Sequence, residues 1–239
     1  MILRRLVLVF SIVLCGSLAL AAAATAAGGM GPGNYTFHSS AANAFFGMGK
    51  KGGPPAPSFS VNVNQGLNSF KPAHPNGPRV VLDSTMVFVT EFDANGNGGY
   101  GCFIVPDSNF TVGHEVQNAA LHTTLTADEA CPGYGTPVGG SKDAFFPGGN
   151  GGLVLPITVD VTWSSNGAVT TFKQAFTLEC ESYYEDGSST NQSTGASASG
   201  SISALSGQFT SDIADVISTD GQLDIRGTPP ASGCFPPAG

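Results

Sequence analysis

Residues 157–180, ITVDVTWSSNGAVTTFKQAFTLEC, constrain the fold more than any other part of the chain. The first seven alternate between apolar and polar side chains, which is the pattern of a strand with one buried face. Asn166-Gly167 follows, the dipeptide that best tolerates the two positive φ angles of a type I′ turn. A second strand-like run then extends to Cys180. The segment therefore predicts a β-hairpin.

A two-residue turn would fix the register of this hairpin. The cross-strand pairs expected on its inner face are Val161–Phe172, Ile157–Phe176 and Trp163–Thr170, of which the first two are apolar on both strands. On the outer face, Asp160 is expected opposite Lys173, and such opposite-charge pairs contribute about 0.2–1 kcal/mol each. A slip of one residue would move the phenylalanines into water, so the pattern favours this register.

The N-terminal residues 1–26 have the pattern of a secretory signal peptide. Arg4 and Arg5 form its positive end, an apolar stretch covers residues 6–20, and Ala24-Thr25-Ala26 provides a small-residue cleavage site. The alternative is an uncleaved membrane anchor. The cleavage motif favours a removed signal, and hence a secreted, extracellular protein with no transmembrane segment in its mature chain.

The remaining chain is expected to form one acidic domain. Residues 27–33 are a glycine-rich, flexible leader, and residues 34–239 are enough for a single sandwich-sized core. Loss of Arg4 and Arg5 leaves seven basic and seventeen acidic side chains, a net charge of about −10. Nucleic acid and anionic membrane surfaces are poor partners for such a chain. Only 11% of all residues are charged, so Ser, Thr, Asn and Gly must supply much of the polar surface.

Four cysteines remain after removal of the signal: Cys102, Cys131, Cys180 and Cys234. An even number in a secreted chain indicates disulfides, and four cysteines allow three connectivities. Pairing of nearest neighbours in the sequence favours Cys102–Cys131 and Cys180–Cys234. Because C-x-x-C is absent and no His lies close to a Cys in sequence, the spacing does not suit a metal site.

Short alternating runs between Gly, Pro, Asn and Asp predict further strands. They cover residues 35–46, 58–63, 80–92, 101–105, 109–112, 119–126, 197–205 and 222–226. Residues 185–195 are expected to be a polar turn. Residues 211–218 are the single helical candidate of the mature chain, because Ile213, Val216 and Ile217 share a helical face. The pattern predicts an all-β, antiparallel β-sandwich of Ig-like or jelly-roll-like type, with at most this one short helix.

Asp93, Asn95 and Asn97 match the front of a calcium-binding loop, D-x-N-x-N-G. The bidentate Glu that such a loop needs at its twelfth position is missing, because Ile104 stands there. The alternative is a hairpin loop, since Asn and Gly tolerate left-handed backbone conformations. No cofactor is therefore expected, and calcium at this loop is the alternative.

Two histidines, His114 and His122, lie eight residues apart. The spacing differs from the H-E-x-x-H motif of zinc proteases. On one strand the two side chains would stand about 26 Å apart, at ~3.3 Å per residue, which is too far for a shared metal ion. Both are therefore interpreted as surface or loop histidines.

Glu179, Glu181 and Tyr183 are the candidate binding residues, expected on the outward face of the second hairpin strand. Two carboxylates about 6–7 Å apart, beside an aromatic ring, meet the minimum needs of a glycosidase. The alternative is a solvated sheet face whose charges discourage edge pairing. The nucleophile motif G-x-S-x-G is absent from the sequence.

We expect a secreted, non-catalytic β-sandwich that binds a glycan or protein ligand through its loops, because no catalytic constellation accompanies the export signal. An extracellular glycan-acting hydrolase using Glu179 and Glu181 is one alternative, and a structural cell-surface or matrix component is the other. The single tryptophan, Trp163, is expected in the core, which argues against an aromatic-lined glycan groove. Glycosylation sequons, meaningful in a eukaryotic protein, begin at Asn34, Asn109 and Asn191.

Overall fold

The computed structural model describes residues 32–47, 56–72, 80–95, 98–131, 153–180 and 183–227, with the backbone alone at residues 67–72, 80–83 and 180. The predicted signal peptide, residues 1–26, lies outside these ranges. The strands of the described chain are β1 (Gly33–Phe46), β2 (Ser58–Pro72), β3 (Val80–Phe92), β4 (Gly98–Val105), β5 (Phe110–Val112), β6 (Asn118–Leu125), β7 (Ile157–Ser165), β8 (Thr170–Cys180), β9 (Tyr183–Ile202) and β10 (Leu205–Arg226). Its short 3-10 helices are η1 (Asp107–Asn109), η2 (His114–Val116) and η3 (Ala127–Glu129).

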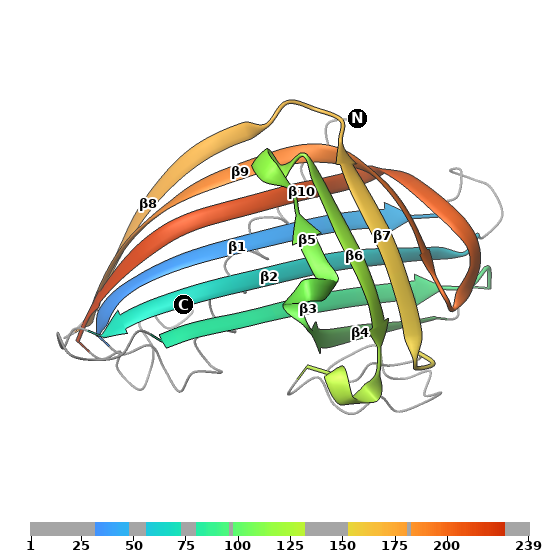
Figure 1. The fold of residues 1–239 in the computed structure, drawn as a ribbon, viewed down its shortest axis with the longest axis horizontal. Helices are drawn as coiled ribbons and strands as arrows, with labels where there is room; N and C mark the ends of the chain where they lie inside the picture. Colours follow the sequence, from blue (N-terminus) through green and yellow to red (C-terminus); the bar gives the residue numbers. More distant parts are fainter. Residues whose placement is uncertain are drawn as a thin grey trace, which may run out of the picture.

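These strands form one antiparallel sheet in the order β4-β3-β2-β1-β10-β9-β7-β6-β5, with β8 beside β9 (Figure 1). The prediction of an antiparallel all-β fold is confirmed. Figure 1 shows β5, β6 and β7 crossing over β1 to β4 at a steep angle. The two layers of the sandwich are thus facing halves of one continuous sheet. The described part of the chain has no helix that is long and apolar enough to span a membrane.

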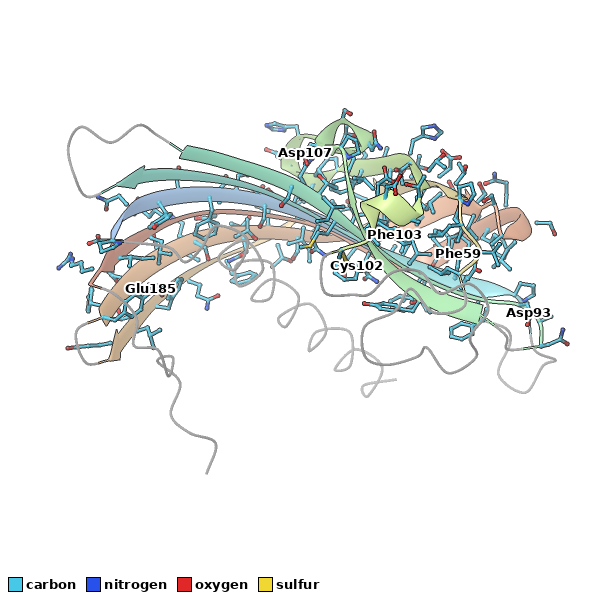
Figure 2. All side chains as sticks on the ribbon, turned by 90° about the horizontal axis from the view of Figure 1, so that it is seen from below. Phe59, Asp93, Cys102, Phe103, Asp107 and Glu185 are labelled. Atoms are coloured by element: carbon cyan, nitrogen blue, oxygen red, sulfur yellow. A yellow bond between two sulfur atoms is a disulfide. The ribbon has the colours of Figure 1, made fainter. Side chains whose placement is uncertain are left out.

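The main core lies between the two halves and draws buried side chains from both. Trp163 of β7 is 1% exposed and packs edge-to-face against Phe110, with ring centroids 6.5 Å apart. Its indole N–H donates to the carbonyl oxygen of Asn43 at 2.9 Å, which joins the crossing strands to β1. Figure 2 shows Phe59 and Phe103 at the end of the molecule that holds the main core, and Glu185 at the opposite end of the long strands.

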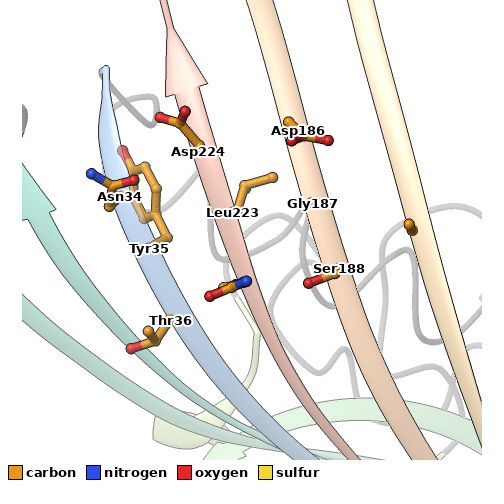
Figure 3. Close-up of a pocket in the computed structure, with 10 residues that line it drawn as sticks. Asn34, Tyr35, Thr36, Asp186, Gly187, Ser188, Leu223 and Asp224 are labelled. Atoms are coloured by element: carbon orange, nitrogen blue, oxygen red, sulfur yellow. The ribbon is translucent and has the colours of Figure 1, made fainter.

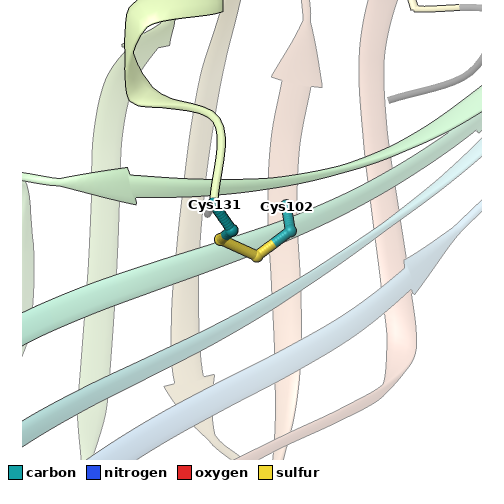
Figure 4. Close-up of a disulfide and its surroundings, with 2 residues drawn as sticks. All are labelled: Cys102 and Cys131. Carbon is teal, nitrogen blue, oxygen red and sulfur yellow. A yellow bond between two sulfur atoms is a disulfide. The ribbon is translucent and has the colours of Figure 1, made fainter. Parts of the chain in front are cut away.

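A disulfide joins Cys102 in β4 to Cys131, which follows η3 (Figure 4). The backbone N–H of Cys131 also donates to the carbonyl oxygen of Cys102 at 3.0 Å, and Phe103 forms an isolated bridge with Ala130. The link connects β4, at one rim of the sheet, to the segment that follows β6. It is one of the two predicted pairs. Cys234, in the other pair, lies outside the described residues.

The hairpin predicted for residues 157–180 is wrong, because β7 and β8 do not pair with each other. Both strands run antiparallel to the same edge of β9, where β7 pairs with residues 196–202 and β8 with residues 183–193. Residues that were predicted to face each other across the hairpin therefore do not pair. Phe172, expected opposite Val161 in the core, is 51% exposed.

The connection between β7 and β8 explains this result. A type I′ turn needs positive φ at both central residues, and neither Asn166 nor Gly167 has positive φ. The backbone N–H of Asn166 instead donates to the carbonyl oxygen of Gly195 at 3.0 Å. Because β9 has 20 residues, its edge accommodates both strands. Residues 166–169 form an irregularity along that edge and do not reverse the chain.

Two further predictions fail in the long β9–β10 hairpin. Residues 185–195, expected as a polar turn, lie within β9, and residues 211–218, the helical candidate, lie within β10. A register shift occurs between Ser211 and Ala214, and three consecutive residues beginning at Ala214 are buried. This β-bulge interrupts the alternation of apolar and polar side chains along the strand. The apolar residues therefore have a spacing like that of one face of a helix.

The buried face of the long strands changes halfway along them. In β1, Tyr35 and Phe37 are buried at one end, whereas Ala42 and Ala44 are buried at the other. Because side chains alternate between the two faces of a strand, these pairs belong to opposite faces. The main core therefore covers one face, and a second cluster is buried on the opposite face at the far end. That second cluster consists of Tyr35, Tyr183, Leu223 and Ile225.

Candidate functional site

A groove of about 680 Å³ lies on the end of the sheet that β1, β8, β9 and β10 form (Figure 3). Its lining residues are Asn34, Tyr35, Thr36, Ala175, Asp186, Gly187, Ser188, Gln222, Leu223 and Asp224. The register of β1 is regular, so Asn34 and Thr36 share a face with Ala42 and Ala44 of the main core. The groove is therefore the continuation of the core face beyond the crossing strands.

Polar side chains stand in two rows across this groove. The first row contains Thr177, Asp186, Asp224 and Asn34, and the second contains Ser188, Gln222 and Thr36, with the apolar Ala175 at its end. Directly opposite residues of antiparallel strands point to the same face, with Cβ atoms about 4.5–5.5 Å apart. The register thus gathers carboxylate, amide and hydroxyl groups within the reach of one small ligand.

Asp186 and Asp224 are direct cross-strand neighbours, and carboxylates in this position repel each other. Arg226 offsets the repulsion, because its Nη2 and Nε donate to Asp224 Oδ2 at 2.6 and 2.9 Å. The Arg226 guanidinium also lies 5.3 Å from the ring centroid of Tyr184. Thr177 donates its hydroxyl to Asp186 at 3.3 Å. Asp186 remains exposed in the groove, whereas Asp224 is held in an ion pair.

Two buried tyrosines lie on the opposite face, behind the groove. Burial raises the pKa of Tyr35 to about 12. Burial, followed by the hydrogen bond that Tyr183 donates to Glu185 at 2.6 Å, raises the pKa of Tyr183 as well. Both phenols are neutral at physiological pH, so they support the strands and do not supply a titrating group.

The predicted site of Glu179, Glu181 and Tyr183 is divided by the β8–β9 turn. Cys180 pairs with Tyr183, so the chain reverses between them and the alternation does not continue through the turn. Glu179 is exposed and lies opposite Tyr184, while Glu181 lies outside the described residues. The expectation that Tyr183 shares the face of Glu179 is wrong, because Tyr183 is buried on the other face.

The residues considered for metal binding lie apart from the groove. Asp93 and Asn95 lie just after β3, and the backbone N–H of Asn95 donates to Asp93 Oδ1 at 2.8 Å, as in an Asx turn. Asn97 lies outside the described residues, so the calcium site stays a prediction. His114 and His122 are exposed, as expected. Within the described ranges, no group of three or more His, Cys, Asp and Glu side chains is placed to share a metal ion.

The three sequon asparagines differ in their surroundings. Asn109 donates its side-chain amide to Thr123 at 3.1 Å, and Asn191 donates to Ser189 at 3.2 Å. Asn34 lines the groove. A glycan on Asn34 would therefore compete with a ligand for the same space.

The groove residues of β9 and those of β10 could not be predicted from the sequence, for two different reasons. Residues 222–226 alternate polar and apolar, so a strand with a polar face is expected there. The sequence does not show that this polar face adjoins Asn34 and Asp186, because cross-strand pairing joins residues far apart in the chain. Asp186 and Ser188 have no apolar alternation around them, and their segment has the composition of a turn.

No protein-family model and no curated protein matches this sequence. Among solved structures, the chain is similar to the enduracididine biosynthesis enzyme MppR complexed with the condensation product of pyruvate and imidazole 4-carboxaldehyde, at 8% identity and a TM-score of 0.25, over 83% of this chain and 89% of that one. It is also similar to lipovitellin at 9% identity and a TM-score of 0.13, over 87% of this chain and 26% of that one. Neither similarity is close enough to carry an argument about fold or function.

One buried carboxyl lies outside the groove, at Glu91 of β3. Glu91 is 7% exposed and lies opposite Phe59 of β2. Its Oε2 atom is buried without a hydrogen-bond partner in the described part of the chain. Burial raises the pKa of this carboxyl, because desolvation disfavours its charged form. An unpaired buried carboxylate is a source of instability at neutral pH.

We expect Glu91→Gln to stabilise the protein at alkaline pH by about 1–2 kcal/mol. Because the folded-state pKa lies above the unfolded value, the favourable contribution is fully present below about pH 4.3 and is lost as the pH rises through the folded pKa. Urea denaturation at about pH 4 and about pH 8 measures this difference. The Asp128→Asn variant, at an exposed position in η3, should keep the pH dependence of the native protein. A Glu91→Gln variant with that same dependence would disprove the assignment.

Proposed function

We propose that this chain is a secreted, non-catalytic binding protein that holds an uncharged, polyhydroxylated ligand of the oligosaccharide class in the groove. The observation that carries the proposal is the lining itself, where polar side chains stand on the uncovered continuation of the core face. Concave sites with a few convergent polar groups are the usual location of small-ligand binding. The ligand is held by strand residues, and not by loops.

The chemistry of the lining favours a neutral ligand with many hydroxyls. Gln222 and Asn34 can both donate and accept hydrogen bonds, whereas Asp186 accepts only. Neighbouring sugar hydroxyls can donate to a carboxylate and accept from an amide at the same time. The charged side chains of the lining are Asp186 and Asp224, so an anionic ligand would be repelled.

Secretion is supported by the signal-peptide pattern of residues 1–26 and by the Cys102–Cys131 disulfide, since such bonds persist in oxidising compartments. A binding role is favoured over hydrolysis because glycosidases need two carboxyl groups in acid and base or nucleophile roles. In the groove, Asp224 is committed to the ion pair with Arg226, which leaves Asp186 without a second available carboxylate.

A glycan array on the secreted chain, followed by calorimetry on the best ligand, tests the proposal. We expect Asp186→Asn and Gln222→Ala each to weaken binding about tenfold, or about 1.4 kcal/mol, because the first removes the charge that strengthens a hydrogen bond to the ligand and the second removes a hydrogen bond altogether. Asp128→Asn, the same chemical change at an exposed position in η3, should bind as the native protein does.

Three outcomes would overturn this proposal: an array with no bound glycan, groove variants that bind with native affinity, or release of reducing sugars from the ligand. The last of these would favour the hydrolase instead.

A further inference from the structure

Strand β8 is a long edge strand of the sheet in the part of the chain that the structure describes. Among the described strands it pairs with β9 alone, and Figure 1 places it at the outer rim of the sheet. Its register with β9 is regular from Thr170 to Cys180, with no bulge. Unpaired N–H and C=O groups along such an edge are a template for another strand.

The usual protections of an edge strand are scarce in β8. Its sequence, TTFKQAFTLEC, contains no Pro and no Gly, and Lys173 is its one basic residue. Phe172 is 51% exposed, although it is a large apolar side chain. Edges of this length are normally shortened, bulged or lined with charge to prevent pairing. The lack of these protections favours a role for the β8 edge in pairing with another strand.

We propose that the partner of β8 is β8 of a second copy of this chain, in an antiparallel, two-fold symmetric pairing centred on Phe176. Lys173 lies three residues before Phe176, and Glu179 lies three residues after it. In this register each Lys173 stands opposite Glu179 of the partner subunit, and the contact forms twice. A symmetric interface needs such a self-complementary pattern, whereas an unrelated partner does not.

The two faces of β8 agree with this register. Lys173 and Glu179 lie on the groove face, since their neighbours on β9 are Thr190 and Tyr184. Phe176 packs against the second cluster on the opposite face, and it meets its own copy across the two-fold axis. A register centred one residue earlier would place Lys173 opposite the partner's Thr177 and would leave both charges unpaired.

The pairing would place two grooves on the same side of a continuous sheet. Residues that stand opposite each other in antiparallel strands share a face, so the two-fold axis is perpendicular to the sheet. Ala175 of β8 already lines the groove, and the second groove begins beyond the new strand pair. This self-association does not depend on the identity of the ligand.

Sedimentation velocity of the secreted chain over a concentration series tests the pairing. We expect a dimer whose dissociation constant rises about tenfold or more in Lys173→Glu and in Glu179→Lys, because each change places like charges opposite each other twice. The double variant Lys173→Glu/Glu179→Lys restores opposite charges and should recover the native constant. Asp128→Lys, a charge reversal in η3, should have no effect.

The register is tested by mixing a chain that carries Ala175→Cys with one that carries Thr177→Cys. These positions stand opposite each other in the proposed dimer, so a mixed disulfide should form faster than either symmetric one. Mass spectrometry of unreduced peptides identifies the linkage.

A monomer at all concentrations, a dimer indifferent to both charge reversals, or a double variant without recovery would refute the pairing. Retention of glycan binding in that case would show that the self-association fails and the groove proposal stands.

Discussion

Trp163→Ala is expected to lower the free energy of unfolding by about 3–5 kcal/mol. The side chain is 1% exposed and packs against Phe110, so truncation leaves a cavity between the two halves of the sheet. It also leaves the carbonyl oxygen of Asn43 without its indole donor. At about 2–4 °C per kcal/mol for a chain of this size, the melting temperature should fall by roughly 6–20 °C.

Denaturation followed by circular dichroism measures the effect, since the variant lacks the single tryptophan of the chain. Trp163→Phe keeps an aromatic ring and should cost less, which separates the cavity from the lost hydrogen bond. Ile104→Ala, at a position that is 40% exposed on β4, is the control and should change stability by no more than about 0.5 kcal/mol. A loss below 1 kcal/mol in Trp163→Ala would contradict this packing.

Replacing both Cys102 and Cys131 with alanine is expected to cost about 3–4 kcal/mol. The bond closes a loop with a sequence separation of 29, and its removal frees the unfolded chain. It also removes the covalent tie between β4 and the segment after β6, where the backbone hydrogen bond from Cys131 to Cys102 and the bridge between Phe103 and Ala130 remain. Both cysteines are buried, so small cavities add to the loss.

Denaturation with and without a reductant checks this prediction. The reductant should destabilise the native chain by the loop-closure contribution of about 3–4 kcal/mol, without the added cost of the cavities. Any effect of the reductant that persists in the double variant reports the predicted pairing of Cys180 with Cys234. A double variant as stable as the native chain would show that the loop is held by its other contacts.

Pairing along the β8 edge would allow two weak ligand-binding grooves to hold one long ligand. Tyr35 is the aromatic residue of the described lining, and its side chain is buried on the opposite face, so a single groove offers a ligand hydrogen bonds and no stacking surface from this ring. Single-site affinity is expected to be modest on this account. Two grooves on one side of a paired sheet would bind a repeating polymer with a gain in avidity, without any new contact. The dimer-breaking Lys173→Glu variant should then lose affinity for long ligands more than for short ones.

Strand positions and one disulfide of this fold can be predicted from local patterns. Residues 80–92, expected as a strand, form β3 with the same bounds. Pairing of nearest neighbours selects Cys102 and Cys131, because a short separation brings the two sides together at low entropic cost. The candidate site was harder to predict from local patterns. Of its predicted residues, Glu179 lies at the turn next to the groove, and Tyr183 is buried behind it.

The failure of the hairpin prediction has a clear physical cause. The alternation in residues 157–165 shows that a strand has a buried face, but it does not show which strand will pair with it. Asn166-Gly167 favours a reversal locally, yet one edge of the 20-residue β9 provides antiparallel partners for residues 159–165 of β7 and for the whole of β8. Tertiary pairing outweighs a turn preference in this competition.

The sequence by itself determined that this chain forms antiparallel strands with a disulfide-linked core, because period-two alternation and cysteine spacing are local properties. The tertiary structure alone decided that the long strands bury opposite faces at their two ends. In β1 the face of Ala42 lies under the crossing strands, whereas the same face at Asn34 extends beyond them and lines the groove. Burial depends on what covers a face, and the covering strands come from a distant part of the chain.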